Sequence, residues 1–336
     1  MVSIAPPAAC YSPTPMNANA PLVSVLLASR NGARFLPEAL ASIASQTYPA
    51  IEPVLVDDGS TDGTRAILAR FAEAHPEARV LHTNGIGLAA ALALAAREAR
   101  GAYLARHDDD DRSHPERIAR QMSFLEANPE VGVLGTAAHM IDGEGRRIGS
   151  HPVPLTSDEI RHVLRRAAPF VHGSVVMRQE AYEAAGGYRG AFPASQDYDL
   201  WLRMAPRTGL ANLAEPLYEW RLHDAGVFSR ARGDQLFYAA VARAFADERR
   251  DAGSDSVALL SNGADPEAFL SRYPRAGRLA LYLGEVHVRE GLGPEGRRYL
   301  GRALRESEFK ALPWWLLAWL IPWTPRGRRA SRRART

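Results

Sequence analysis

The chain has 336 residues, of which 46% are hydrophobic and 24% are charged, and its formal net charge at pH 7 is +3. This composition is typical of a soluble globular protein with one large domain, or with one large and one small domain. The single cysteine, Cys10, excludes disulfides and cysteine-based metal sites. Six arginines lie among the last eleven residues, and without them the net charge would be −3: Arg326, Arg328, Arg329, Arg332, Arg333 and Arg335. The body of the chain is therefore mildly acidic, which argues against nucleic-acid binding.

The first 20 residues are rich in Pro, Ala, Ser and Asn. They have no basic start and no apolar stretch of signal-peptide length. We expect a disordered leader, not an export signal.

From Pro21 onward, short apolar runs alternate with amphipathic segments. Strands are predicted over residues 22–28, 54–56, 79–82 and 102–105, and helices over residues 37–46, around 67–71 and over 88–97. Strands and helices of these lengths in alternation predict an α/β fold with a mostly parallel sheet covered on both faces.

Two of these strands end in acidic loops, one at Asp57-Asp58 and one at Asp108-Asp109-Asp110-Asp111. In a parallel sheet both loops lie at the same edge, where ligands of α/β sheets bind. Four adjacent carboxylates repel one another, and a divalent metal bound by one or two of them and by substrate phosphates would hold them together. The alternative is a solvated acidic turn. A metal is favoured because the run directly follows an apolar segment and precedes a helix start at Ser113.

The rest of the chain continues as a mixed pattern and then becomes helical. Helices are predicted over 115–127, 158–165 and 197–204, strands over 131–141, 171–177 and 217–222, and turns at 142–145 and 186–188. Beyond Asp234 the pattern is helical, and residues 279–288 and 297–304 are expected to pair as a hairpin. The expected domains are a leader (1–20), an α/β domain (21–232), a helical region (233–310) and a Trp-rich segment with a basic tail (311–336).

The stretch from Leu312 to Trp323 holds four tryptophans among Leu, Ile and Pro. It is far shorter than the ~20 apolar residues of a membrane-spanning helix. Tryptophans beside arginines fit a segment that lies on an anionic membrane surface. The alternative is a C-terminal helix docked on the body, and the sequence leaves both open.

Several short motifs follow one another between about residues 22 and 229: Leu22-Val23-Ser24-Val25-Leu26-Leu27, Asn31-Gly32, Ser45-Gln46-Thr47-Tyr48-Pro49, Val56-Asp57-Asp58-Gly59-Ser60-Thr61-Asp62, Ala105-Arg106-His107-Asp108-Asp109-Asp110-Asp111, Gly186-Gly187-Tyr188, Asp197-Tyr198-Asp199-Leu200-Trp201 and Arg221-Leu222-His223. In this order they resemble glycosyltransferase family 2. The resemblance implies the GT-A fold and inverting transfer of a sugar from a nucleotide-diphosphate donor.

The resemblance also implies donor contacts. Asp57 and Asp58 match acids that contact the base and ribose of the donor, for which a carboxylate is a suitable acceptor. The alternative for this pair is an Asp-Gly turn that caps the next helix. Asn31 is expected to line the same pocket. Arg221 and His223 match a segment that approaches the diphosphate, to which Arg is well suited.

Metal binding is implied for Asp108 and Asp110, which match the outer acids of an Asp-X-Asp motif whose last acid reaches the metal, Mn²⁺ or Mg²⁺. The metal would neutralise charge that develops on the leaving diphosphate. Asp109 fills the middle position, where the family often has a small residue. Which acid binds the metal and which contacts the donor therefore stays open among the three.

An inverting displacement needs a base that takes the proton of the acceptor hydroxyl. Asp197 matches the family's base, and Gln196 stands where the family frequently has Glu. Asp199 points to another face of a helix. His172 matches a position often filled by His, and either lines the active site or is structural.

Together these features predict a metal-dependent inverting glycosyltransferase of the hexosyl or N-acetylhexosaminyl type. A UDP-sugar donor and a glycan or lipid-linked acceptor of a cell-surface polysaccharide are expected, on the cytoplasmic side and held peripherally at the membrane. One alternative is a catalytically inactive sugar-nucleotide-binding scaffold. Another is a sugar nucleotidylyltransferase, although the Gly-rich loop usual in that class is absent from residues 28–32.

Overall fold

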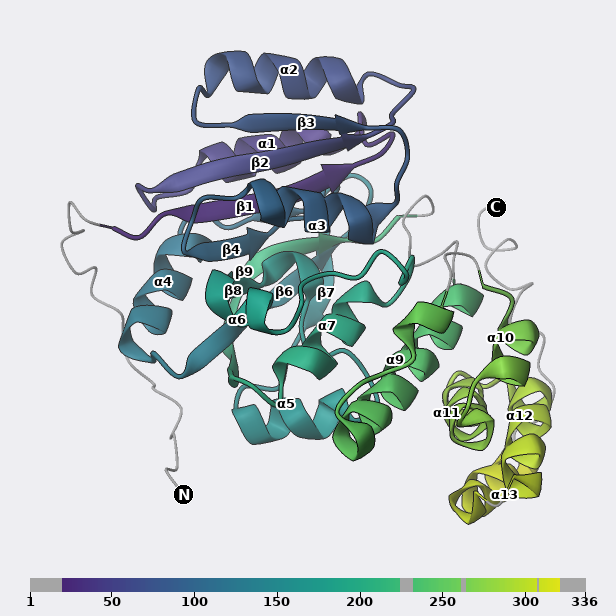
Figure 1. Ribbon diagram of the computed structural model, residues 1–336. Coiled ribbons are helices and arrows are strands. Elements are labelled where there is room, and N and C mark those ends of the chain that lie inside the picture. Colours follow the sequence, from purple (N-terminus) through teal and green to yellow (C-terminus); the bar gives the residue numbers. More distant parts are fainter. Residues whose placement is uncertain (1–19, 224–231, 261–263, 307, 321–336) are drawn as a thin grey trace. The chain divides into compact units, whose positions relative to one another are not determined.

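A computed structural model describes residues 20–223, 232–260, 264–306 and 308–320 (Figure 1). The expected leader at residues 1–20 lies outside this part except for Ala20. Contacts divide the chain into two compact units, residues 1–230 and 231–336, which we describe separately.

The described residues of the first unit build one nine-stranded sheet in the order β3-β2-β1-β4-β8-β6-β9-β5, with β7 paired to β6. The strands are β1 (Val23–Ser29), β2 (Ile51–Asp58), β3 (Arg79–Thr83), β4 (Tyr103–Arg106), β5 (Arg112–Ser113), β6 (Val131–Ile141), β7 (Arg147–His151), β8 (Val176–Arg178) and β9 (Gly209–Arg221). Strands β1 to β4 are mutually parallel, as the alternating pattern predicted. Beyond β4 the sheet is mixed, because β8 pairs antiparallel with both β4 and β6.

Helices cover the parallel half of the sheet on both faces (Figure 1). The helices of this unit are α1 (Leu36–Ala44), α2 (Thr64–Ala74), α3 (Leu88–Glu98), α4 (Arg117–Ala127), α5 (Ser157–Leu164), α6 (Gln179–Ala184) and α7 (Gln196–Met204). Side chains alternate along a strand, so Val23, Val25 and Leu27 of β1 face one side. There they pack in a buried cluster with apolar residues of α1 and α4.

The sequence prediction was wrong at two places in this unit. The strand expected over 171–177 begins instead as a 3-10 turn, His172–Ser174, and continues as the short β8. The turn forms because the Ser174 hydroxyl bonds back to the Val171 carbonyl at 2.8 Å. Strand β9 begins at Gly209, eight residues before the predicted start, and its pairing with β6 is interrupted by register shifts. Those irregularities conceal the alternation on which the prediction relied.

The second unit is helical, as predicted. Its helices are α9 (Arg232–Ala252), α10 (Pro266–Arg272), α11 (Ala276–Arg289), α12 (Gly293–Arg305) and α13 (Leu312–Leu320). Helices α11 and α12 form the expected hairpin and approach closely at Gly284, where an added Cβ would lie 2.3 Å from Leu300 Cγ. No helix in the described ranges is both long and apolar enough to cross a membrane.

Candidate active site

The loops that follow β1, β2 and β4 meet at one edge of the sheet, as their parallel pairing requires. The Ser29 hydroxyl at the end of β1 donates to the Asp109 carboxylate in the loop after β4. The backbone N–H of Asn31 donates to Ser60 Oγ at 3.0 Å, which joins the loop after β1 to the loop after β2. The predicted convergence of the two acidic loops is therefore confirmed.

Asp57 ends β2 with a buried carboxylate. Its Oδ1 accepts from the Ser60 N–H at 3.0 Å, and its Oδ2 lies 3.3 Å from Nδ1 of His82 on β3. Burial opposes ionisation, but hydrogen bonds from Ser60 and His82 outweigh it and hold the pKa of Asp57 below its ordinary value. Asp57 is therefore an ionised acceptor at neutral pH.

The neighbouring Asp58 is fully engaged by the protein. Its carboxylate accepts from the Thr83 hydroxyl at 2.5 Å, from the Ile86 N–H at 2.7 Å and from the Gly87 N–H at 2.9 Å. This side chain fastens the connection between β3 and α3, so a donor contact through Asp58 stays a prediction.

Asn31 is exposed and has a left-handed backbone, with φ 58°. Its side-chain oxygen accepts from the Thr61 N–H at 2.8 Å. Its amide nitrogen therefore remains the group that could serve a ligand at this edge of the sheet.

The acidic turn after β4 contains a buried cation that sequence reasoning missed. Arg106, the last residue of β4, is completely buried, and its guanidinium donates to the Asp108 carboxylate. Its Nε and one terminal nitrogen, NH1, have no hydrogen-bond partner. Burial opposes ionisation of Asp108, yet the nearby Arg106 keeps the pKa of Asp108 below its ordinary value. The only signal in the sequence was a charged residue inside an apolar strand.

The pKa values of the next two carboxylates, those of Asp109 and Asp110, are raised instead of lowered. Burial and the neighbouring charges of Asp110 and Asp108 raise the pKa of Asp109 to about 7. Burial and Asp108 likewise raise the pKa of Asp110, which His223 partly offsets. Negative charge is thus crowded at this turn without enough positive charge to balance it.

The fourth acid of the turn, Asp111, stabilises the fold. Asp111 is buried, and its Oδ1 accepts from the backbone N–H of Arg221 at 2.7 Å. Burial and the nearby Asp110 raise the pKa of Asp111 well above its ordinary value. This residue is therefore a buried anchor between the acidic turn and the end of β9.

The end of β9 closes over the same turn. Arg221 donates from Nε to the Asp110 carbonyl at 2.7 Å and from NH2 to Glu38 Oε2 at 2.8 Å. Its NH1 lies 3.3 Å from the Asp142 carbonyl oxygen. Because all three guanidinium nitrogens have protein partners, binding of a diphosphate by Arg221 stays a prediction that requires this network to open.

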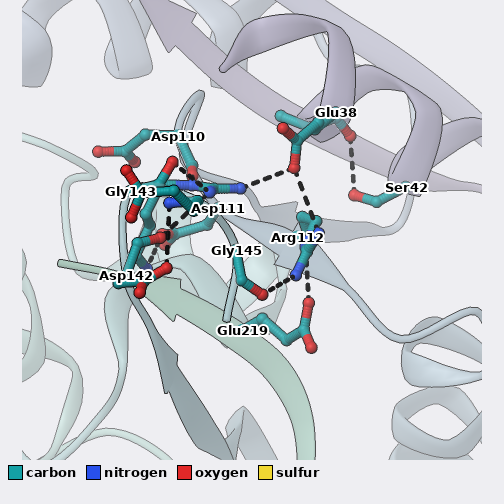
Figure 2. Close-up of polar contacts among 12 residues, drawn as sticks. Glu38, Ser42, Asp110, Asp111, Arg112, Asp142, Gly143, Gly145 and Glu219 are labelled. Atoms are coloured by element: carbon teal, nitrogen blue, oxygen red, sulfur yellow. Dashed lines mark hydrogen bonds and ion pairs between the residues drawn. The ribbon is translucent and has the colours of Figure 1, made fainter. Parts of the chain in front are cut away.

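Glu38 joins this network from α1, and sequence reasoning did not select it. Its carboxylate also accepts from Arg112 NH1 at 3.3 Å, and Arg112 in turn donates to Glu219 of β9 at 2.7 Å (Figure 2). The backbone carbonyl of Gly145 accepts from the same guanidinium at 3.1 Å. The turn after β6 is thus linked to α1 and β9.

The candidate base, Asp197, lies in the first turn of α7, two residues after Ser195, whose φ of 54° sharply redirects the chain. Asp197 is partly exposed, and its carboxylate has no hydrogen bond or ion pair with any described residue. Gln196 beside it is buried. A partly exposed carboxylate without a hydrogen bond to the described residues is available to a substrate hydroxyl.

The burial of Asp199 confirms the prediction that its side chain points to another face of the helix than that of Asp197. It is completely buried and accepts from Nε of Arg189 at 2.9 Å and from Nε of Arg203 at 3.0 Å. The same helix also directs Trp201 into the core. Asp199 therefore stabilises the fold.

His172 is close to both the acidic turn and the candidate base. Its Nε2 is 2.8 Å from the Tyr188 hydroxyl. Burial and the nearby Arg106 lower the pKa of His172, while the charges of Asp197 and Asp108 act in the opposite direction. A carboxylate of the acidic turn and the carboxylate of the candidate base therefore both lie near one imidazole, and a role of His172 in lining the site stays a prediction.

The carboxylates of the acidic turn fit a divalent cation. In the described part of the chain no three His, Cys, Asp or Glu side chains could hold a metal by themselves. A cation that shares one or two carboxylates with the phosphates of a substrate does not need a third protein ligand. Burial and mutual repulsion raise the pKa values of Asp109 and Asp110, because the turn carries more negative than positive charge. Asp108 and Asp110 are the residues that would hold such an ion.

Comparison with known proteins finds related sequences over much of the chain. A family model described as Glycosyl transferase family 2 matches residues 24–186. The protein EpsE of Bacillus subtilis (strain 168), named as a glycosyltransferase, is 37% identical over 215 residues, which cover 62% of this chain and 76% of EpsE. The amylovoran biosynthesis glycosyltransferase AmsE of Erwinia amylovora is 34% identical over 188 residues, or 55% of this chain and 70% of AmsE.

Solved structures show the same fold. S. aureus TarS 1–349 in complex with UDP-GlcNAc superposes with a TM-score of 0.60 at 18% identity and covers 84% of this chain and 81% of that chain. The mannosyltransferase PcManGT from Pyrobaculum calidifontis in complex with GDP-Man and Mn²⁺ has a TM-score of 0.52 at 22% identity, with 94% and 88% covered.

Proposed function

The chain belongs to glycosyltransferase family 2 and has its α/β GT-A fold with added C-terminal helices, and from this premise we propose that it transfers a sugar from a nucleotide-diphosphate donor to an acceptor hydroxyl with inversion. One observation carries the proposal: the charges of Asp197 and of Asp108 act on the same His172. The candidate base and the carboxylates of the acidic turn thus both lie near this imidazole. An inverting displacement requires both.

Asp197 is the proposed base. As the acceptor hydroxyl attacks the anomeric carbon, its proton passes to the Asp197 carboxylate and the bond to the diphosphate breaks on the opposite side. The lack of protein partners for this carboxylate supports the role, because a base must contact the proton that it removes. Gln196, which is buried beside it, is proposed to line the pocket.

Asp108 and Asp110 are proposed to hold Mn²⁺ or Mg²⁺. When bound, the ion would supply positive charge to the leaving diphosphate. Arg106 prepares the site by keeping Asp108 ionised in a buried setting. Asp109, which is fixed by Ser29, is proposed to contact the donor from the same turn.

The donor base and ribose are assigned to the edge formed by β1 and β2. Asp57 is ionised and can accept from an N–H or a hydroxyl, and the Asn31 amide is exposed beside it. Asp58 would act indirectly, through the loop that it fastens. Arg221 and His223 would approach the diphosphate from the end of β9.

We further propose a hexosyl or N-acetylhexosaminyl group as the transferred sugar and a UDP-sugar as the donor. The structural neighbour TarS is described in complex with UDP-GlcNAc, which supports this choice, whereas PcManGT is described with GDP-Man. The name of AmsE supports a role in polysaccharide biosynthesis, with a glycan or lipid-linked acceptor.

Calorimetric titration of UDP- and GDP-sugars into the protein, first with Mn²⁺ and then with chelator, tests the proposal. Metal-dependent binding of one donor, weakened in Asp110→Asn and unchanged in the exposed-site control Asp158→Asn, is the expected result. Equal binding by the wild type and Asp110→Asn would remove the acidic turn from the site. Tight donor binding without any turnover would favour a sugar-nucleotide-binding scaffold.

A further inference from the structure

The 3-10 turn His172–Ser174, which precedes β8, packs against the end of β4 and the acidic turn that follows it. The Arg106 N–H donates to the Val175 carbonyl at 2.8 Å. A Cβ added to Gly173 would lie 2.7 Å from Asp108 Oδ2, so the backbone of the turn is in contact with this carboxylate. His172 is therefore held beside the acidic turn.

The ring of His172 also lies beside the helix that carries the candidate base. Its centroid is 6.4 Å from that of Trp201 on α7, and the two ring planes are inclined by 70°. Asp197 and Trp201 are four residues apart in this helix, so their side chains project from the same face. In a displacement the transferred sugar lies between the acceptor hydroxyl and the diphosphate. A group that is close to both the base and the acidic turn is therefore close to that sugar.

Tyr188 binds one nitrogen of this imidazole. Its hydroxyl is 2.8 Å from Nε2 of His172, and neither of these two atoms has another hydrogen-bond partner among the described residues. Burial raises the pKa of Tyr188 well above its ordinary value, while burial and Arg106 lower the pKa of His172, so a neutral phenol faces a neutral imidazole. The phenol donates, because the reverse arrangement would leave its buried O–H without an acceptor. His172 therefore accepts at Nε2 and carries its proton on Nδ1.

The position of Tyr188 is itself set by buried contacts. Its backbone N–H donates to the Tyr182 hydroxyl at 2.9 Å, and Arg203 donates to the Gly187 carbonyl at 2.6 Å. Gly187 has a φ of 61°, and a Cβ added there would lie 2.8 Å from the Tyr182 hydroxyl. The loop that carries Tyr188 thus has little room to move, and it holds the phenol against His172.

We propose that Tyr188 is a positioning residue, which fixes the tautomer of His172 so that the Nδ1–H donates a hydrogen bond to an oxygen of the transferred sugar. Nδ1 of the partly exposed His172 has no hydrogen bond with any described residue. With Nε2 occupied by Tyr188 and Nδ1 protonated, the imidazole has no free lone pair, so the role of base is left to Asp197. This inference rests on the proposed function, because it requires a nucleotide-sugar in the site.

Calorimetry on the full chain with Mn²⁺ tests this inference. The ligands are the UDP- or GDP-sugar that the wild type binds and the matching nucleoside diphosphate, UDP or GDP, which lacks the sugar. Tyr188→Phe keeps the ring and removes the hydroxyl, so it should weaken nucleotide-sugar binding by about 3–10-fold, the effect of one hydrogen bond, and leave UDP or GDP binding unchanged. The matched control is Tyr48→Phe, which also loses a hydroxyl, one that donates to the Pro21 carbonyl at 2.7 Å. It should bind both ligands like the wild type.

Substitutions of His172 separate positioning from a merely structural role. The amide N–H of Asn reaches the place of Nδ1, whereas the amide of Gln reaches the place of Nε2. His172→Asn should therefore bind the nucleotide-sugar about 3–10-fold more tightly than His172→Gln. In the His172→Asn background, Tyr188→Phe should cause no further loss, because no tautomer remains to be fixed. Thermal unfolding followed by circular dichroism checks that each variant is folded.

Three results would overturn the inference. The first is a wild-type affinity of Tyr188→Phe for the nucleotide-sugar, and the second is an equal loss of affinity for the nucleotide-sugar and the nucleoside diphosphate. The third is an undiminished effect of Tyr188→Phe in the His172→Asn background. In each of these cases, metal-dependent donor binding by the wild type leaves the glycosyltransferase proposal standing. Absence of donor binding by the wild type would contradict that proposal, and this inference with it.

Discussion

The Nε2 atom of His223 lies 2.9 Å from Oδ2 of Asp110, although the two residues are 113 positions apart in the sequence. The His223 ring also packs against Phe35, with ring centroids 4.8 Å apart. The segment after β9 is therefore held against both the acidic turn and the loop after β1. One carboxylate oxygen of Asp110 is oriented by this contact, and the other is left for a ligand.

His223→Gln is expected to weaken Mn²⁺-dependent donor binding by about 10–100-fold, the range typical for partners that orient a metal-binding carboxylate. The physical reason is that Asp110 loses its fixed orientation. Calorimetry measures the affinity. His162→Gln, at an exposed position on α5, is the control, and equal affinities for the two variants would contradict the prediction.

Asp197→Asn should reduce sugar transfer by about 10²–10⁴-fold, the contribution of a general base, while donor affinity and stability stay close to wild type. The amide keeps the shape of the side chain and cannot accept the proton. Initial rates of transfer and calorimetric affinities measure the two effects separately. A variant that transfers at the wild-type rate would remove Asp197 from the base role.

Asp199→Ala should behave in the opposite way and unfold more easily. It leaves Arg189 and Arg203 without the carboxylate that they share, and breaking a buried ion pair costs about 3–5 kcal/mol. Urea denaturation measures the free energy of unfolding. A change below about 1 kcal/mol would mean that solvent replaces the carboxylate without cost.

Gly32→Ala should disturb the site through packing. An added Cβ would lie 2.2 Å from Asp109 Oδ2, so Asp109 must move, at a cost of about 1–3 kcal/mol. We expect weaker donor binding and a lower free energy of unfolding. The control is Gly63→Ala, whose Cβ would be 3.6 Å from its nearest neighbour and whose φ is −74°. Similar donor affinities for both variants would contradict the placement of Asp109.

The lowered pKa of the buried Glu52 carboxylate should make the free energy of unfolding depend on pH. Burial opposes its ionisation, but hydrogen bonds from Ser24 and Arg100 prevail and hold the pKa of Glu52 below its ordinary value. The unfolded chain therefore binds the proton more tightly, so the stability from Glu52 is present above the unfolded pKa of about 4.3 and is lost as the pH falls through the lower folded pKa.

Glu52→Gln should therefore be less stable than the wild type at pH 7, and this difference should shrink toward pH 3. Urea denaturation across that range measures it. The exposed Glu180→Gln on α6 should show no such trend. A stability difference that does not vary with pH would rule out ionisation of Glu52 as the cause.

Much of the parallel half of the fold could be predicted from the sequence, because β1 is an apolar run and α1 has apolar residues at helical spacing. The acidic ends of β2 and β4 were also predicted to lie at one edge of the sheet, and they do. Sequence spacing could not show that the Asp58 carboxylate accepts from Thr83 and two backbone N–H groups, or that the Arg221 guanidinium donates to Glu38 and to backbone carbonyls. These contacts depend on loops brought together from distant parts of the chain.

The role of Arg106 could not be predicted from the sequence either. Its burial could not be read from a four-residue strand, and its role as a counter-charge for Asp108 becomes evident only in the folded site. The start of β9 was missed because its register shifts against β6 remove the regular alternation of buried and exposed residues. Irregular strand pairing and long-range polar contacts are therefore the features that the pattern of apolar and polar residues alone could not predict.

The most direct test of the central claim is transfer of a radiolabelled sugar from a panel of UDP- and GDP-sugars to a cell-envelope extract, with Mn²⁺ or chelator, by the wild type and by Asp197→Asn. The account predicts that the wild type transfers label from one donor only when the metal is present, and that Asp197→Asn binds this donor without transferring its sugar. Transfer that is unaffected by both the chelator and the substitution, or no transfer from any donor by the wild type, would contradict it.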